Sequence, residues 1–515
     1  MLSAYRAERR KLFAQVSTRA LALVCALGPV AFAIVLSAQS GVPADSLLGV
    51  WVHNSGYAVS FVVLDFAGYV GFALLAGVLA GDLFSSEDRY GTWKTVLTRS
   101  RSRADVFAGK LLAAAVLALA LVGLLALSSL VAGLVLTGDQ PLVGLDGNVI
   151  PSGEALWLVL ASWLVSIPAV LAFVSLSVLF SVASRSGIVG VLGAVLVALV
   201  MQLLALVGRG TWAHLLLVAS AFDDWHGLLA APKFYGQLII GSCIALIWVA
   251  GCLAASWAMF RRRDFAGPPV SGRPGWTRPA QAVLGSMALI VLLGAIASVG
   301  PSAITKARLE SAVLRAFNDL TVLQQRELGR TVPAGTELNL TTTCGRRSGK
   351  SEGPGDDWSC TMTVVRASAG YNPFELTPVT YDVSVKSNGC YKAESPPSFV
   401  GRETMVDAHG QTVINPLFTI YGCFDVIGSA PRCPRNTRCG EAVAPRPAGA
   451  AGTRTTPPAE RQQQQRALHE AERAAGPRVM HEVEEAERKL EHETAHPQPE
   501  AERAPRTEAP AQTRK

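Results

Sequence analysis

Charge is scarce in this sequence, and its scarcity restricts the class of protein. Only 17% of the 515 residues are charged, whereas 50% are hydrophobic and the mean hydropathy is +0.32. The apolar residues stand in long runs, which is unusual for a soluble domain. A net charge of +7 would suggest nucleic acid, but the basic residues cluster at the ends of the apolar runs. The composition therefore favours a membrane protein and gives no reason to expect a nucleic-acid partner.

Motifs of catalysis are also weak. The strings HETAH at 492–496 and GKSEG at 349–353 match the spellings H-E-x-x-H and G-x-S-x-G, but the first lies in the polar tail and the second in a Gly/Ser-rich stretch, and the sequence shows no convincing catalytic triad. The string GRRSGKS at 345–351 differs from a phosphate-binding loop, because three residues instead of four separate Gly345 from Gly349. We therefore expect that this chain is not an enzyme and that it carries no catalytic residue, no metal site and no cofactor of its own.

Short cysteine spacings are missing as well. Six of the nine cysteines lie in a late polar region: Cys344, Cys360, Cys390, Cys423, Cys433 and Cys439. No pair has the C-x-x-C spacing typical of zinc sites, so disulfides are favoured, with zinc as the alternative. Among the fifteen possible arrangements we expect Cys344–Cys360 across a hairpin, then Cys390–Cys423, with Cys433 and Cys439 closing a terminal loop. Disulfides indicate an extracytoplasmic setting.

Seven apolar runs each have about the length needed to cross hydrocarbon about 30 Å thick. They cover about 18–38, 58–82, 109–137, 155–182, 187–207, 235–259 and 280–300. A cleavable signal peptide ending at Ser37-Ala38 is the alternative for the first run, but about twenty residues favour a retained span. The other three cysteines lie in these runs and are expected to be packing residues: Cys25, Cys243 and Cys252.

Lysine and arginine are nearly absent from alternate connections. Loops 39–57 and 138–154 contain none, whereas 83–110 contains six and 260–279 contains five. The positive-inside rule then predicts a multi-pass protein of the cell membrane with a cytoplasmic N-terminus. Seven spans leave everything after about residue 300 outside, which agrees with the cysteine pattern.

A few polar residues in or beside the runs are candidates for function. Asp65 lies about seven residues into the second run, so it is a candidate for a translocation path; the alternative is a position among the outer headgroups. Asp223, Asp224 and His226 could bind a metal or substrate, but we favour a turn between short interfacial helices.

The later chain changes its periodicity. Apolar residues recur at helical spacing over 303–328, and from about 336 they alternate with polar residues. The predicted fold class is an all-α polytopic membrane bundle of six spans plus one, with a small disulfide-linked extracytoplasmic α+β domain and a disordered tail. The domains expected are a basic interfacial segment at 1–16, a six-span permease domain at 17–262, a cytoplasmic linker at 263–279, a seventh transmembrane helix at 280–300, the extracytoplasmic domain at 301–440 and an Ala/Pro/Glu/Arg-rich tail at 441–515.

The basic connection after the second run has an ordered pattern. It contains an acidic residue, a Gly-Thr pair, a leucine-containing turn, a Ser-Arg pair and a Gly-Lys pair: Glu87, Gly91-Thr92, Val96-Leu97, Ser102-Arg103 and Gly109-Lys110. Together with the basic start and six spans, this order resembles the permease subunits of type-two ABC exporters. The resemblance covers about residues 1–262.

The resemblance implies that this connection is a coupling helix which docks on an ATP-hydrolysing subunit. It implies coupling roles for six residues: Glu87, Gly91, Thr92, Trp93, Arg103 and Lys110. Glu87 would make an ionic contact, Gly91 would allow a tight bend, and Trp93 would be exposed at the wet interface. A loop that merely enforces topology is the alternative, particularly for the arginines.

The resemblance further implies a separate ABC ATPase subunit that holds ATP and Mg, and pairing with a second copy or a related permease. The substrate would be amphipathic or lipid-like and would move outward, and membrane lipid surrounds the chain. The seventh span, the extracytoplasmic domain and the tail depart from the usual pattern. The alternatives are a receptor or sensor whose extracytoplasmic domain binds a ligand, and an anchor for envelope assembly.

Overall fold

A computed structural model describes residues 2–38, 47–99, 102–207, 217–263, 303–332, 339–366 and 378–427, together with Gly285. These residues belong to one compact unit, Met1–Glu441. The expected linker and seventh span lie outside the described residues except for Arg263 and Gly285. The tail at 441–515 and the pair Cys433 and Cys439 lie outside them as well.

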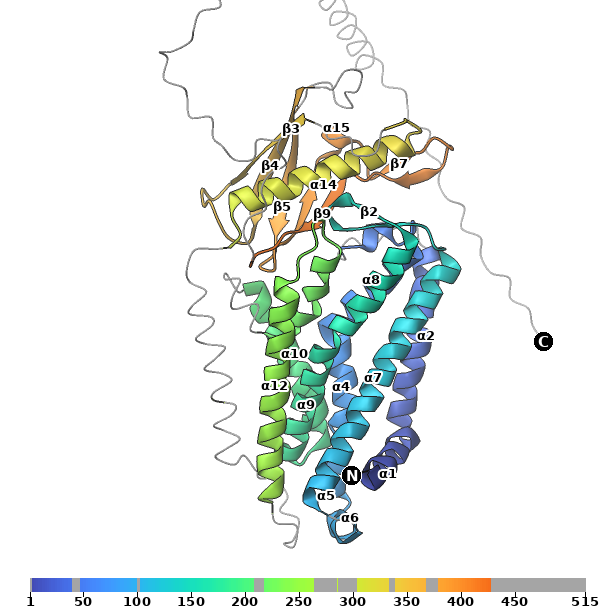
Figure 1. Cartoon of the computed structure of the whole chain (residues 1–515), viewed down its shortest axis with the longest axis vertical. Helices are drawn as coiled ribbons and strands as arrows, with labels where there is room; N and C mark the ends of the chain where they lie inside the picture. Colours follow the sequence, from blue (N-terminus) through green and yellow to red (C-terminus); the bar gives the residue numbers. More distant parts are fainter. Residues whose placement is uncertain are drawn as a thin grey trace, which may run out of the picture. The chain divides into compact units, whose positions relative to one another are not determined.

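Six helical segments in the described part of the chain are long and apolar enough to cross a membrane (Figure 1). They are Val16–Ala38, Gly56–Arg89, Arg103–Leu136, Ser152–Ser184, Gly187–Leu204 and Gly236–Arg261. Helices form their backbone hydrogen bonds internally, which is required in hydrocarbon because lipid chains offer no donors or acceptors. These segments match the first six predicted runs, so the prediction of a mostly helical chain with the character of a membrane bundle is confirmed.

Several of these segments consist of more than one helix. The helices before residue 100 are α1 (Leu2–Ala14), α2 (Val16–Ala38), α3 (Gly56–Phe66), the π-turn η2 (Ala67–Gly71), α4 (Phe72–Ala80), α5 (Ser85–Arg89) and α6 (Trp93–Arg99). Those after it are α7 (Arg103–Leu136), α8 (Ser152–Val165), α9 (Ile167–Ser184), α10 (Gly187–Val207) and α12 (Gly236–Arg261). Pro168 lies at the start of α9, where a missing backbone N–H is tolerated.

Glycine permits two close helix contacts within the bundle. A Cβ atom on Gly133 of α7 would lie 2.1 Å from the carbonyl oxygen of Gly56 in α3. One on Gly190 of α10 would lie 2.2 Å from the carbonyl oxygen of Gly81, which follows α4. Small residues let helix backbones approach in this way when lipid surrounds the bundle.

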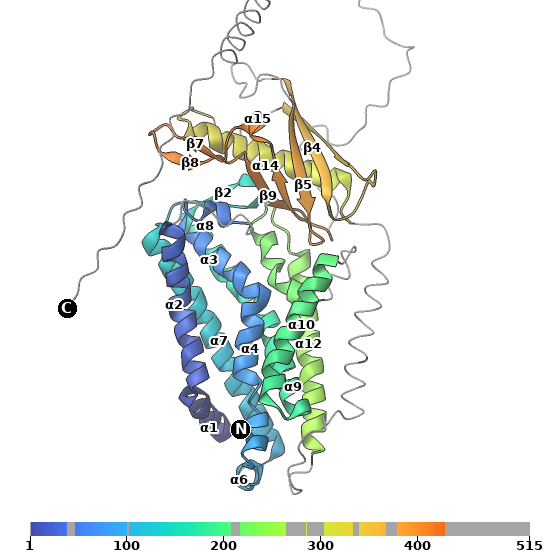
Figure 2. The ribbon, with the colours of Figure 1, turned by 180° about the vertical axis from the view of Figure 1, so that it is seen from behind.

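The later residues form a small α+β domain, here called the β domain (residues 303–427). Its helix α14 (Lys306–Glu327) lies on a five-stranded antiparallel sheet of order β3-β4-β5-β6-β9 (Figure 2). The strands are β3 (Asn339–Arg346), β4 (Gly355–Arg366), β5 (Val379–Val385), β6 (Cys390–Glu394) and β9 (Thr419–Cys423). Phe317 of α14 packs edge-on against Tyr381 of β5, with ring centroids 6.1 Å apart. The predicted helix and sheet are both confirmed.

Short elements complete the described fold. Two hairpins pair β1 (Leu142–Val143) with β2 (Val149–Ile150), and β7 (Thr404–Val406) with β8 (Thr412–Ile414). The remaining turns of helix are η1 (Gly49–Trp51), η3 (Leu145–Gly147), η4 (Val218–Phe222), η5 (Asp224–Leu228) and α15 (Pro397–Val400).

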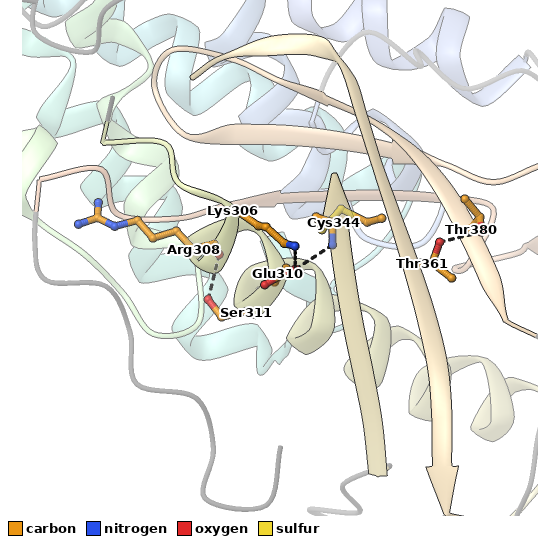
Figure 3. Close-up of a disulfide and its surroundings, with 8 residues drawn as sticks. Lys306, Arg308, Glu310, Ser311, Cys344, Thr361 and Thr380 are labelled. Atoms are coloured by element: carbon orange, nitrogen blue, oxygen red, sulfur yellow. Dashed lines mark hydrogen bonds and ion pairs between the residues drawn. A yellow bond between two sulfur atoms is a disulfide. The ribbon is translucent and has the colours of Figure 1, made fainter. Parts of the chain in front are cut away.

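Two disulfides join neighbouring strands of the sheet. Cys344 in β3 is bonded to Cys360 in β4, and Cys390 in β6 is bonded to Cys423 in β9. Figure 3 shows the first of them beside Glu310 of α14, whose carboxylate accepts a hydrogen bond of 2.8 Å from the backbone N–H of Cys344. Both predicted pairings are therefore confirmed.

Among the described residues, the three cysteines of the helical part are free. Cys25 and Cys252 are buried, as expected of packing residues. Cys243 is exposed, so the prediction that it packs inside the bundle is wrong. An apolar run does not show which face of a spanning helix turns outward, because lipid and protein neighbours are both apolar.

Candidate functional site

The segment with the exporter-like pattern forms an elbow, defined here as residues 85–110. Its two short helices, α5 and α6, meet at Gly91, which has a φ of +66° and no atom within 4 Å of an added Cβ. This left-handed conformation favours glycine, so the tight bend expected at Gly91 is present. Figure 1 shows α5 and α6 at the same end of the bundle as α1.

A buried lysine joins the elbow to the N-terminal helix. The Nζ atom of Lys110 in α7 lies 2.8 Å from Glu8 of α1, 3.1 Å from Glu87 of α5 and 3.1 Å from the carbonyl oxygen of Leu83. Lys11 of α1 also donates to Glu87, at 2.7 Å. Lys110 is fully buried, so its charge depends on these partners. Two lysines and two glutamates thus connect α1, α5 and α7.

A second set of contacts connects the elbow to α12. The indole N–H of Trp93 donates to Asp88 at 2.8 Å, and Arg263, just beyond α12, pairs with the same carboxylate. Arg103 donates to the carbonyl oxygens of Arg261 and Arg263, at 2.8 and 3.0 Å. Basic side chains suit these carbonyls, since the last turn of a helix leaves its carbonyl groups without helical partners.

The expectation that Trp93 is exposed is wrong, because only 4% of it is accessible. Its ring packs against Phe260 and Phe84, with centroids 5.3 and 6.2 Å away. A large ring is strongly stabilised by burial once its N–H has an acceptor, which Asp88 supplies. Trp93 therefore supports the elbow from within.

The structure brings together all six residues that the resemblance selected. Thr92 donates its hydroxyl hydrogen to Glu87, which completes the contacts of that carboxylate. Glu87 already binds Lys11, Lys110 and Thr92 inside the chain, so its ionic contacts are internal. The exposed residues of the elbow include Arg89, Tyr90, Gly91, Lys94, Thr95 and Thr98.

Sequence reasoning missed four residues of this cluster: Glu8, Lys11, Asp88 and Arg263. One signal for Glu8 was available, because it is the only acidic residue among the first sixteen. A lone carboxylate in a basic segment that lies beside a membrane suggests a buried cationic partner.

The other end of the helical bundle carries a second polar group. Asp223 separates η4 from η5, so the predicted turn between short helices is present at Asp223, whereas Asp224 and His226 lie within η5 itself. Both side chains are buried, and among the described residues neither Asp224 Oδ2 nor either ring nitrogen of His226 has a hydrogen-bond partner. Burial raises the pKa of Asp223 to about 7 and lowers the pKa of His226 to about 3.

The described residues contain no group of three or more His, Cys, Asp or Glu side chains that could hold a metal ion. Asp65 is 9% exposed, and its charge contributes to the raised pKa of Asp223. Asp65 and Glu87 are 22 residues apart, or about 33 Å of α-helix. Hydrocarbon is about 30 Å thick, so helix length allows each carboxylate to lie near one membrane boundary.

Asp146, in the turn between β1 and β2, links the helical bundle to the β domain. One carboxylate oxygen accepts from the Tyr391 hydroxyl at 3.4 Å, and the other accepts from the backbone N–H of Ala231 at 3.3 Å. Burial raises the pKa of Asp146 to about 7, against the opposing charge of Arg315. We call the polar groups at this end of the bundle the junction: Asp146, Asp223, Asp224 and His226.

Residues 26–266, which include all six apolar segments apart from the first part of Val16–Ala38, match a family described as "Protein of unknown function (DUF2705)". No curated protein matches this chain.

Proposed function

We propose that this chain is the permease subunit of an ABC-type exporter, and that a separate ATPase subunit drives outward transport of an amphipathic or lipid-like substrate. The observation that carries the proposal is the elbow. A short helix between two spanning segments is held by buried ion pairs and hydrogen bonds to α1, α7 and α12. A displacement of α6 would move these helices together, since they form one packed network.

The partners follow from this arrangement. The ATPase subunit would hold ATP and Mg and contact the elbow from the cytoplasm, and a second copy or a related permease would complete the transporter. The basic connections support a cytoplasmic elbow, and the two disulfides support an extracytoplasmic β domain.

The exposed face of the elbow would form the docking surface. Tyr90 is 70% exposed, and Lys94 and Thr95 are exposed beside it. In contrast, Glu87, Trp93 and Lys110 would transmit the movement from inside. The two groups can be tested separately, because exposed substitutions leave the buried contacts intact.

We expect the full chain to co-purify with a separate ATPase that carries a G-x-x-x-x-G-K-[ST] motif, and the test uses that purified pair. We expect this chain to stimulate ATP hydrolysis. Lys94→Glu and Tyr90→Ala should each reduce the stimulation up to about tenfold, as for residues central to a protein interface. The thermal midpoint of the purified chain should stay unchanged.

Lys350→Glu is the matched control, since Lys350 is exposed in the β domain far along the chain from the elbow. Equal rates of ATP hydrolysis with and without this chain would contradict the proposal. Loss of stimulation in the Lys350 variant as well would show that the effect is not specific to the elbow.

A receptor or sensor is the second candidate. It is favoured by the buried polar contacts between the β domain and the helices, such as the 2.9 Å hydrogen bond from Gln237 of α12 to the carbonyl oxygen of Asn388. A ligand on the β domain could change these contacts without any ATPase. Signalling that persists when the separate ATPase is inactivated would favour this candidate.

A further inference from the structure

A cavity of about 310 Å³ lies between the helical bundle and the β domain. Its lining includes Leu47, Tyr69, Lys386, Tyr391, Lys392 and Tyr421. Leu47 and Tyr69 belong to the helical part, and the others belong to β6, β9 and the turn after β5. The volume falls at the lower end of the range of small-molecule sites, about 300–1,000 Å³.

The sheet turns different faces to α14 and to this cavity. Tyr381 packs on α14, and alternation along β5 places Ser384 on the opposite face. Ser384, Lys392 and Tyr421 are consecutive partners across β5, β6 and β9. Ser384, Lys392 and Tyr421 therefore share the face opposite Tyr381, whereas Tyr391, which pairs with Val385, reaches the cavity from the core face.

Lys386 is the cation that this cavity has available. Within the part of the chain that the structure describes, no carboxylate lies close enough to Lys386 to form an ion pair, whereas Lys392 pairs with Glu394 at 2.6 Å. The charge of Lys386 lowers the pKa of Asp223 without an ion pair. A solvated lysine is common on a surface, but this one is held at the mouth of a cavity by a tight turn. In that turn the backbone N–H of Lys386 donates to the carbonyl oxygen of Cys390 at 2.8 Å.

The opposite wall has the character of a membrane boundary. Tyr69 lies in the π-turn η2, where the helical hydrogen-bond pattern changes, and such turns are frequent at functional sites. Tyrosine also favours the level of lipid headgroups. Leu47 adds an apolar contact on the same side. The cavity thus has a cationic, hydroxyl-rich wall on the sheet and an amphipathic wall on the bundle.

We propose that this cavity binds a phosphate or carboxylate anion, and that Lys386 makes the principal contact to it. The phosphate of an anionic lipid headgroup and a free phosphate share this chemistry. Lys392 supplies further donors, because its ammonium group has three N–H groups and the contact with Glu394 does not use all of them. The inference concerns binding alone, so it does not depend on coupling to an ATPase.

The test uses the full chain in nanodiscs of phosphatidylcholine and measures binding of two probes by calorimetry. The probes are a short-chain phosphatidylglycerol and inorganic phosphate. We expect Lys386→Gln to weaken binding of the effective probe by about tenfold or more, as for loss of a charge-assisted hydrogen bond. Lys386→Arg should keep most of the affinity, and Lys350→Gln should keep all of it.

Each outcome decides something. Binding of phosphatidylglycerol alone identifies a lipid headgroup site, and equal binding of both probes identifies a site for the free anion. Wild-type affinity in Lys386→Gln, or no binding of either probe by the wild-type chain, overturns the proposal. An equal thermal midpoint for Lys386→Gln and the wild type separates lost binding from lost folding. Because no ATPase is present, failure of this test leaves the exporter proposal untouched.

Discussion

The elbow and the junction both bury ionisable residues, but they differ in whether those residues have oppositely charged partners. At the elbow Lys11 and Lys110 meet Glu8 and Glu87 at 2.7–3.1 Å, so each charge has an opposite charge beside it. At the junction, the hydrogen-bond donors to Asp146 among the described residues are neutral: the backbone N–H of Ala231 and the Tyr391 hydroxyl. Asp224 Oδ2 and the His226 ring nitrogens have no hydrogen-bond partner among the described residues.

This difference indicates different mechanical roles. A network of paired charges resists separation of its members, because the departure of one member would leave the opposite charge buried and unpaired. A buried group without full compensation is instead stabilised by a change of protonation, by a ligand or by movement toward water. The elbow is therefore suited to transmit movement as a unit, and the junction is suited to respond to its surroundings.

The strongest test of this comparison removes the centre of the elbow. Lys110→Ala leaves Glu8 and Glu87 buried with one fewer cation, and breaking a buried pair typically costs about 3–5 kcal/mol. We expect a loss of that size in the free energy of unfolding, measured by denaturant titration of the purified chain in detergent. Lys94→Ala, at an exposed position on the same elbow, should change it by less than about 0.5 kcal/mol.

A double variant sharpens this test. Lys110→Met combined with Glu8→Leu removes both members of one pair and fills the space with apolar atoms, so much of the lost stability should return. If Lys110→Ala proves no more harmful than Lys94→Ala, the elbow is not held by its buried charges, and the contrast with the junction fails.

The next test concerns pH and the junction. Asp146 has a pKa of about 7 when folded and 3.8 as its ordinary value. Below pH 3.8 the carboxyl is protonated in both states; between 3.8 and 7 the unfolded state ionises first, so stability falls as pH rises. Above pH 7 the carboxyl is ionised in both states, so its effect on stability no longer changes with pH. Asp146→Asn removes this dependence, and asparagine accepts the positive φ of 70° at this position.

We therefore expect Asp146→Asn to melt at a higher temperature than the wild type at pH 8 and at the same temperature at pH 4. The difference is a few kcal/mol at most, since each pKa unit corresponds to about 1.4 kcal/mol. Asp139→Asn, at an exposed position in the same connection, should melt at the wild-type temperature at both pH values. Parallel melting curves for Asp146→Asn and the wild type across this range would place the Asp146 carboxyl in water.

Local patterns predicted most of the fold, and distant pairings limited the prediction of the site. The six apolar helices and the sheet follow from continuous or alternating apolar residues, which short stretches of sequence display. The bridge between Cys344 and Cys360 follows from a hairpin. In contrast, Lys110 and Glu8 are 102 residues apart; the lone carboxylate of Glu8 suggests a cationic partner, but nothing in the sequence identifies Lys110 as that partner. The inward direction of Trp93 likewise depends on Phe260, which belongs to a helix far along the chain.

The smallest expected effect concerns a lysine–glutamate pair beside the junction. Lys233 and Glu154 are 2.6 Å apart, which is closer than Lys110 and Glu8 at 2.8 Å, but their side chains are 36% and 46% exposed. Water already solvates both charges, so Lys233→Gln should lower the free energy of unfolding by no more than about 1 kcal/mol. High salt should reduce even this amount, while the fully buried Lys110 should be nearly insensitive to salt. Denaturant titrations of both variants at low and high salt would check the pair of expectations. A cost for Lys233→Gln as large as for Lys110→Ala would mean that distance, and not burial, decides what an ion pair contributes in this protein.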